Sequence, residues 1–204
     1  NNQIEDVKFD LIERDLIGKI IEDKFENVWI AADNGLLRID KKGDFKLFGE
    51  KEGLSSVRIQ TLTEDYEGNI WIGTYGGGVC MFRNEAILSY TQKDGLSNSK
   101  IYAVLNTSKG IILAGSLNGL DYFNGDKFEK INIKPLDNVS ITFIHEDRNG
   151  NIWVATESEG VIVIKHNGST FEKVKAFKNV ESNVVQPAYK IVEDKDGNIW
   201  VSTY

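Results

Sequence analysis

The residues best suited to acid–base or metal chemistry in this sequence are few and scattered. Among its 204 residues are two histidines, His145 and His166, and one cysteine, Cys80. The histidines are not spaced to bring two ligands to one metal ion, as an i, i+4 pair on a helix would be. A single cysteine excludes both an internal disulfide and a cysteine-rich zinc site. We therefore interpret all three as structural or surface residues, and we expect no catalytic residue, no metal site and no cofactor.

An acidic turn at residues 194–198, with the sequence DKDGN, has the oxygen-rich character of a calcium loop. A calcium loop, however, supplies about six oxygen ligands and ends in a bidentate glutamate, and this turn has no such set. Similar turns occur four times in the chain, whereas a site used once would need only one copy. We therefore expect the aspartates to accept hydrogen bonds from the amides of their own turns.

Four tryptophans accompany the acidic turns. An exposed row of aromatic rings stacks sugars or bases, but large repeated side chains also fill the space between packed sheets. We favour the second interpretation and predict a core position for all four, which are Trp29, Trp71, Trp153 and Trp200.

The turns and the tryptophans belong to one repeated phrase. Residues 64–72 read EDYEGNIWI and residues 146–154 read EDRNGNIWV, with related copies at 22–30 and 193–201. A degenerate copy places Leu113 where a tryptophan is expected. The five equivalent positions are separated by 42, 42, 40 and 47 residues. A period near 42 with strand-like content is the size of a four-stranded propeller blade, so we predict an all-β fold, a β-propeller.

The repeat also sets the expected blade boundaries. We predict one propeller fragment or small propeller with four complete blades at about residues 16–49, 56–91, 99–134 and 139–177, a partial blade at 187–204 and a lone outer strand near 7–12. No stretch has a sustained helical period, so almost no helix is expected. Glycines precede the third strand of four units, where a tight hairpin needs a positive φ; they are Gly35, Gly78, Gly119 and Gly160.

Composition narrows the classes of partner. Hydrophobic residues make up 41% of the chain, enough for a sizeable core, which argues against wholesale disorder. The 24 basic and 31 acidic residues give a net charge of −7, which argues against non-specific binding to nucleic acid or to anionic membranes. No apolar run approaches the roughly 20 residues that span a bilayer, and no signal peptide opens the sequence. We expect no nucleic-acid partner and no membrane insertion by this stretch of chain.

Candidate ligand-binding residues follow from blade geometry. The turn between the second and third strands and the connection between blades lie on one face, which carries the mouth of the central channel. Residues that differ between units on that face are the candidates for binding an oligosaccharide or another polar molecule. The turns supply Asp33, Asn34, Tyr75, Ser116, Asn118, Glu157 and Glu159. The connections between blades supply Arg58, Asn98, Lys100 and Tyr102.

One further phrase carries a family resemblance. Residues 53–57 read GLSSV and lead into EDYEGNIWIGT at 64–74, and residues 94–98 repeat the opening as DGLSN. This pattern resembles the two-component regulator propeller repeat, and the resemblance covers nearly the whole chain. It implies a ligand-binding sensor module, periplasmic or on the cell surface, of a membrane histidine kinase, hybrid regulator or diguanylate cyclase. Several such sensors respond to oligosaccharides. The ligand residues of that family are not a fixed motif, so the resemblance assigns no role to individual residues.

The chain departs from that family in size. The family's sensors usually have more blades than 204 residues can encode, so the chain looks like a piece of a longer propeller array. Open strand edges in such a piece invite pairing with another copy, and we favour self-association through them. The alternative is a small ring of about five blades, closed when the N-terminal strand adds to the C-terminal pair.

Other functions stay open at this point. A streptogramin-lyase-like propeller enzyme has similar Gly-Asn-Ile-Trp repeats, but its chemistry is expected to need histidine and acidic residues around a divalent metal, and the two histidines are not equivalent. A sialidase-like enzyme has similar turns but needs clustered arginines, and the five arginines here are scattered. A scaffold that binds protein partners through a propeller face fits the sequence as well as a small-molecule sensor does.

Overall fold

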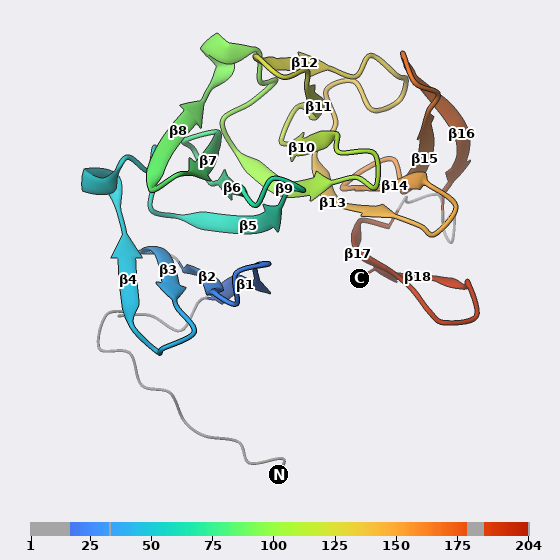
Figure 1. The fold of residues 1–204 in the computed structure, drawn as a ribbon. Coiled ribbons are helices and arrows are strands. Elements are labelled where there is room, and N and C mark those ends of the chain that lie inside the picture. Colours follow the sequence, from blue (N-terminus) through green and yellow to red (C-terminus); the bar gives the residue numbers. More distant parts are fainter. Residues whose placement is uncertain (1–16, 33, 179–185, 204) are drawn as a thin grey trace.

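The protein is a row of antiparallel sheets, seen in a computed structural model that describes residues 17–32, 34–178 and 186–203 (Figure 1). Within these residues 18 strands form four four-stranded sheets and one two-stranded sheet, and there is no α-helix. No helix in the described part of the chain has the length and apolar character that crossing a membrane requires. The predicted all-β propeller with four complete blades is confirmed. The outer strand expected near residues 7–12 lies outside the described residues.

Each blade is built from strands that follow one another in the sequence. The first sheet comprises β1 (Ile17–Glu22), β2 (Val28–Ala32), β3 (Gly35–Ile39) and β4 (Phe45–Phe48). The second comprises β5 (Ile59–Glu64), β6 (Ile70–Thr74), β7 (Val79–Arg83) and β8 (Ala86–Tyr90). The third comprises β9 (Ile101–Asn106), β10 (Ile112–Ser116), β11 (Gly119–Phe123) and β12 (Phe128–Lys130). The fourth comprises β13 (Ile141–Glu146), β14 (Asn151–Thr156), β15 (Val161–His166) and β16 (Phe171–Phe177), and the last β17 (Ala188–Glu193) and β18 (Ile199–Thr203).

The sheets stand side by side in an arc. Figure 1 shows the first strand of every sheet, β1, β5, β9, β13 and β17, on the inner side of the arc, and the fourth strands on the periphery. Successive inner strands contact one another. Two single-turn 3₁₀ helices, η1 (Glu50–Glu52) and η2 (Gln92–Asp94), lie on the long connections that carry the chain from an outer strand back to the next inner one. The arc therefore brings one strand of each sheet to a common centre.

Aromatic side chains fill the space between neighbouring blades. Trp29 is 1% exposed, and its ring lies 4.9 Å from Phe82 of the next blade and 6.0 Å from Phe48 of its own outer strand. Trp71 repeats this arrangement with Phe123 of the next blade, at 5.0 Å. Burial of such rings supplies much of the packing energy, since truncating a buried tryptophan costs about 3–5 kcal/mol. The core positions predicted for these two tryptophans are correct.

The core position predicted for Trp200 is wrong. Its side chain is 62% exposed. In the three complete blades that carry a tryptophan, an aromatic residue of the outer strand covers the indole, as Phe177 covers Trp153 with ring centroids 5.4 Å apart. The sheet of β17 and β18 has no third or fourth strand among the described residues, so this cover is missing over Trp200.

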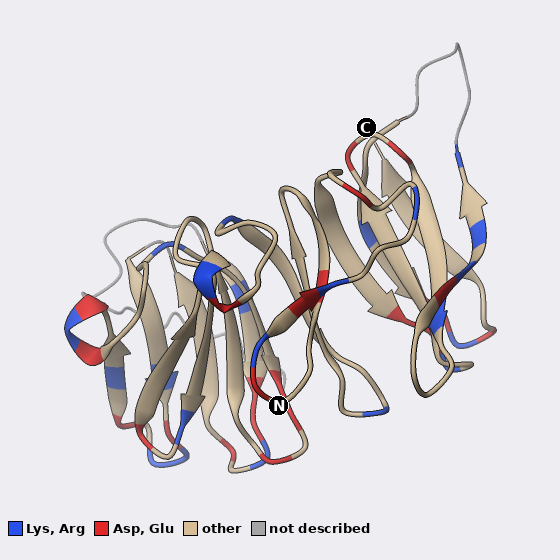
Figure 2. Cartoon of the chain, turned by 90° about the horizontal axis from the view of Figure 1, so that it is seen from above, with Lys and Arg blue, Asp and Glu red and all other residues tan. Residues whose placement is uncertain are grey.

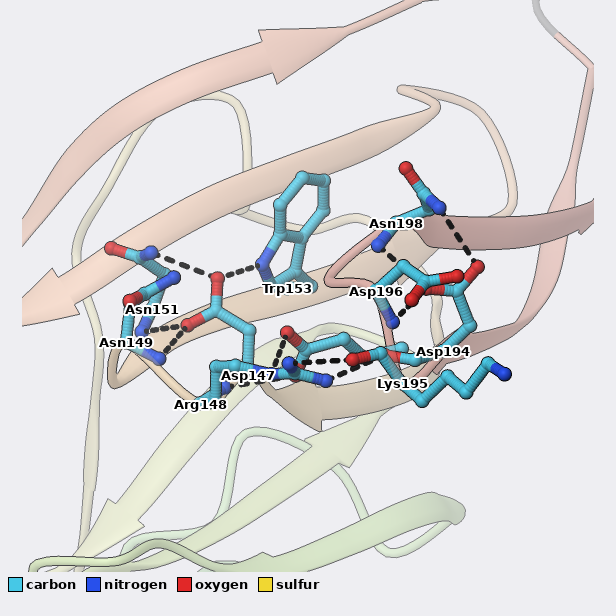
Figure 3. A network of polar contacts seen from close by, with 10 residues as sticks. Asp147, Arg148, Asn149, Asn151, Trp153, Asp194, Lys195, Asp196 and Asn198 are labelled. Atoms are coloured by element: carbon cyan, nitrogen blue, oxygen red, sulfur yellow. Dashed lines mark hydrogen bonds and ion pairs between the residues drawn. The ribbon is translucent and has the colours of Figure 1, made fainter.

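The aspartate of each acidic turn organises the turn around its carboxylate. Figure 3 shows Asp147, whose Oδ1 accepts the backbone N–H groups of Asn149 and Asn151 at 2.9 and 2.8 Å. Its Oδ2 accepts the indole N–H of Trp153 at 2.8 Å. The predicted hydrogen bonds from turn amides to the aspartate are therefore confirmed. The hydrogen bond from the indole N–H additionally explains why aspartate and tryptophan recur together. In the degenerate copy the Thr107 hydroxyl replaces the carboxylate and accepts the Ile111 amide at 3.0 Å.

In three of the four acidic turns, the glutamate before the aspartate accepts hydrogen bonds from the neighbouring blade instead. Glu146 of the fourth sheet accepts the backbone N–H and the hydroxyl of Ser108, which lies in the turn of the third sheet. Glu64 accepts the Lys24 amide of the first sheet at 3.1 Å in the same way. Glu193 accepts the Arg148 amide at 2.9 Å and pairs with its guanidinium at 2.7 Å. The Glu-Asp dipeptide thus holds two turns at once, its own and that of the preceding blade.

The blade-opening phrase is also structural. In the second copy Leu96 is buried, and the amide and hydroxyl of Ser97 donate to the fully buried Asp121 of β11. Burial raises the pKa of the Asp121 carboxyl, while the Ser97 hydrogen bonds oppose that rise. In the first copy Ser55 occupies the same place and lies 3.0 Å from the buried Cys80 sulfur. The single cysteine is therefore part of the blade packing.

Candidate ligand-binding site

The inner strand of every sheet carries a β-bulge at an equivalent residue. The pairing of each inner strand with its neighbour shifts register there. The bulged residues are Gly18, Gln60, Tyr102, Thr142 and Tyr189, at the same spacings as the repeated phrase. A bulge leaves one residue out of the ladder and re-aims its side chain. The repeat thus places one residue per blade around the centre of the arc.

These residues line the central cavity. A cavity of about 300 Å³ is bounded by Gln60, Tyr102, Ser140, Thr142, Glu157 and Tyr189. A second cavity of about 420 Å³ shares four of these residues, the bulged Gln60, Tyr102, Thr142 and Tyr189, so the two hollows adjoin. Their lining combines aromatic rings with amide, hydroxyl and carboxylate groups, a mixture that suits a polar ligand.

A cationic and aromatic cluster lies beside the first cavity. The guanidinium of Arg58 lies 4.5 Å and the ammonium of Lys100 lies 5.0 Å from the centre of the Tyr75 ring. The Tyr102 ring stands edge-on to Tyr75, with centroids 6.1 Å apart. Backbone bonds fix this arrangement, because the Tyr75 amide donates to the Arg58 carbonyl at 2.8 Å and Tyr75 pairs with Lys100 as an isolated bridge. Four residues chosen from the sequence therefore lie together.

The electrostatics of the cluster keep the phenol of Tyr102 neutral. Burial raises the pKa of the Tyr102 hydroxyl, and the neighbouring Tyr75 and Glu157 raise it further, against the opposing charge of Lys100. A neutral phenol can donate one hydrogen bond and accept another. Together with Arg58 and Lys100 the site offers donors, acceptors and an aromatic face.

The remaining residues predicted for the site lie in other surroundings. The side chain of Asn98 accepts the Lys100 amide at 2.9 Å and so orients that lysine. Ser116 is fully buried, donates to the Gly119 carbonyl and accepts the Asn118 amide, as a turn residue. Glu159 forms an ion pair with Lys178.

Two candidates come from the turn between β2 and β3. Asn34 is half-buried there, outside both cavity linings. Asp33 lies outside the described residues.

Sequence reasoning missed four residues of the site, namely Gln60, Ser140, Thr142 and Tyr189. A usable signal does exist for the bulged ones. Each follows directly on a buried apolar residue at the start of an inner strand, as Gln60 follows Ile59 and Tyr189 follows Ala188. A polar or aromatic residue at that point, recurring at the blade period, marks a side chain aimed at the channel.

The two histidines lie on different strands and have different surroundings. His145 lies on β13, where it lines the larger cavity, and no described residue is a hydrogen-bond partner of its buried Nε2. His166 lies on β15 with its ring 4.7 Å from Phe171, and burial, with a contribution from Lys109, lowers the pKa of its imidazole. Within residues 17–32, 34–178 and 186–203 no group of three or more His, Cys, Asp or Glu side chains could hold a metal ion.

The sequence and the fold both have known counterparts. The family model described as two component regulator propeller matches residues 53–76, 135–158 and 182–204. No curated protein matches the chain. Two solved extracellular domains, named as belonging to hybrid two-component systems of B. thetaiotaomicron, have TM-scores of 0.71 and 0.72 at 22% and 20% identity. The likeness covers 92% of this chain and 25% and 26% of those chains.

An enzyme shares the fold as well. Virginiamycin B lyase from Staphylococcus aureus has a TM-score of 0.73 at 17% identity, over 95% of this chain and 65% of the lyase. At these identities the solved structures establish the propeller fold alone. The chain spans about a quarter of the length of the two extracellular domains and less than two thirds of the lyase.

Proposed function

We propose that this chain, which carries repeats of the two-component regulator propeller family, is the ligand-binding part of an extracytoplasmic sensor in a membrane-bound signalling protein. The family match supports a sensor module. The names of the two B. thetaiotaomicron structures, extracellular domains of two-component systems, support the location. The observation that carries the proposal is the cluster of Arg58, Tyr75, Lys100 and Tyr102 beside the central cavity.

The ligand that this cluster favours is an oligosaccharide or a similar polar molecule. Sugar rings present both C–H faces and hydroxyl groups. The rings of Tyr75 and Tyr102 offer surfaces for the former, and Gln60, Glu157 and Lys100 offer hydrogen-bonding groups for the latter. The site is thus suited to binding, and no residue in it has a role that requires turnover.

Because the residues of the site come from several blades, ligand binding can change how the blades are arranged. Gln60, Tyr102, Thr142 and Tyr189 come from four different blades. A ligand that contacts several of them favours the blade arrangement in which all contacts are made, and it shifts the population of the full-length protein by its difference in affinity between arrangements.

Thermal stabilisation by soluble oligosaccharides, with and without divalent metal, tests the proposal. A ligand at 100 times its dissociation constant stabilises the folded chain by about 2.7 kcal/mol. Tyr75→Ala should weaken binding of the responding sugar by at least about tenfold, as truncation of an aromatic contact does. Tyr66→Ala is the matched control, because Tyr66 is 65% exposed and lies at the opposite end of β6.

Other results would favour other functions. Metal-dependent turnover of virginiamycin B would favour a lyase, which the S. aureus structure supports as a second candidate. Binding that is equally strong in Tyr75→Ala and wild type would remove the cluster from the site. Failure of every sugar to bind would favour a scaffold that recognises protein.

A further inference from the structure

Two lysines at the centre of the arc occupy equivalent positions. Lys19 and Lys190 each follow directly on a bulged residue, in β1 and β17, the first and last inner strands of the arc. The three inner strands between them carry Thr61, Ala103 and Phe143 at that position. Both cations therefore belong to the strands that end the arc, and Figure 1 shows these strands, β1 and β17, on opposite sides of its centre.

Both lysines line the same cavity. The hollow of about 420 Å³ includes Lys19 and Lys190 among its lining residues, and no aspartate or glutamate of the described chain is part of that lining. Neither lysine forms an ion pair with a described residue. In Figure 2 the acidic residues of the chain gather mainly at turns and strand ends, away from the middle of the sheets. The larger cavity is thus locally cationic inside a protein of net charge −7, whereas Glu157 lines the adjoining smaller one.

The two charges are close enough to affect each other. Both side chains are exposed to solvent, yet the protein atoms around Lys19 and the charge of Lys190 lower the pKa of the Lys19 ammonium. Like charges that share a space without a counterion repel, and an anion placed between them removes that repulsion and gains charge-assisted hydrogen bonds. Tyr189, Gln60 and Thr142 line the same cavity and supply neutral hydrogen-bonding groups beside the cations.

We propose that Lys19 and Lys190 together bind one anionic group of the ligand, the carboxylate or sulfate of an acidic oligosaccharide. This inference rests on the proposed function and deepens it by naming the ligand class. The acidic group lies in the larger cavity between the two ammonium groups. The neutral part of the ligand lies toward Tyr102 and Tyr75, on the side of the smaller cavity, which shares Gln60 and Tyr102 with the larger one.

The first test uses inorganic sulfate as the probe. Sodium sulfate is titrated into the ¹⁵N-labelled chain at constant ionic strength, with sodium chloride as reference. Saturable amide shifts are expected in β1 and β17 around Lys19 and Lys190, and these shifts should disappear in the double variant Lys19→Gln/Lys190→Gln. The control Lys165→Gln/Lys173→Gln makes the same change in net charge on β15 and β16, at lysines outside both cavity linings, and should keep the shifts. Absent shifts, or shifts that survive in the first double variant, would overturn the proposal.

The second test separates this inference from the sensor function. Glucuronosyl-xylobiose, a trisaccharide with one carboxylate, is compared with its methyl ester, which has the same sugar rings without the negative charge. The acid should bind at least about tenfold more tightly, and the double variant of Lys19 and Lys190 should erase that difference. Equal affinity for acid and ester would leave the sugar-binding function standing and refute the anion site. Sulfate binding at the lysines without binding of either sugar would support the anion site and refute the oligosaccharide ligand.

Discussion

Hydrogen bonds keep the aspartates of the acidic turns ionised. At Asp194 the Trp200 indole N–H, the Asn198 side chain and backbone amides of the turn lower the pKa of the carboxyl from 3.8 to about 2. Burial alone would raise the pKa of Asp147, yet the Trp153 indole and the Asn151 donors outweigh it and lower that pKa as well. The negative charge is therefore a structural part of these two turns.

These lowered pKa values predict acid sensitivity. Because the folded-state pKa of Asp194 lies below the unfolded value, its stabilisation is complete above about pH 4 and is lost as the pH falls toward 2. Asp194→Asn should lower the urea midpoint at pH 7 and flatten its decline between pH 4 and 2. Asp196→Asn is the control, since the Asp196 side chain accepts no hydrogen bond from a described residue (Figure 3). Equal pH profiles for wild type and Asp194→Asn would contradict this account.

At the scale of elements, the glutamates that join neighbouring turns stabilise the stacking of blades. Glu146 accepts two hydrogen bonds from Ser108 across the boundary between the third and fourth sheets. Glu146→Ala should lower the free energy of unfolding by about 1–2 kcal/mol, because the amide and the hydroxyl of Ser108 both lose their charged acceptor. Urea denaturation measures the difference.

The repeat itself offers the matched control for this prediction. Glu22 occupies the equivalent position in β1, and its side chain makes no hydrogen bond or ion pair with another described residue. Glu22→Ala should change stability by less than about 0.5 kcal/mol, as surface substitutions do. A loss in Glu22→Ala as large as that in Glu146→Ala would mean that the contact with the preceding blade contributes nothing.

At the scale of the whole molecule, the repeat predicts what lies within a blade better than what lies between blades. The turn built on Asp147 and the positive φ of Gly78 follow from local sequence. The link from Glu146 to Ser108 joins residues 38 positions apart, and only the stacking of sheets brings them together. The same holds for the candidate site. Tyr75 and Tyr102 could be recognised from the sequence because they vary between repeats. Tyr189 could not, because only the arrangement of the sheets in an arc brings it into the same cavity.

The two sheets that end the arc expose apolar residues that middle sheets bury against a neighbour. On the last sheet Val192 is 58% and Trp200 is 62% exposed. On the first sheet Ile20 and Phe45 are each 54% exposed. Exposed apolar groups on sheet faces and edges favour contact with another copy. We therefore keep the proposal that this stretch of chain associates with itself through its end sheets.

Light scattering tests this association directly. At tens of micromolar the mean mass should exceed the 22.9 kDa of one chain and should fall on dilution. Val192→Lys should shift the mass toward one chain, because a charge on the open face of β17 must be desolvated in any contact there. Leu88→Lys is the control, since Leu88 is 49% exposed but lies on β8, the outer strand of a middle sheet. A mass of one chain at every concentration would refute self-association, and an equal effect of both lysines would place the contact elsewhere than on the end sheets.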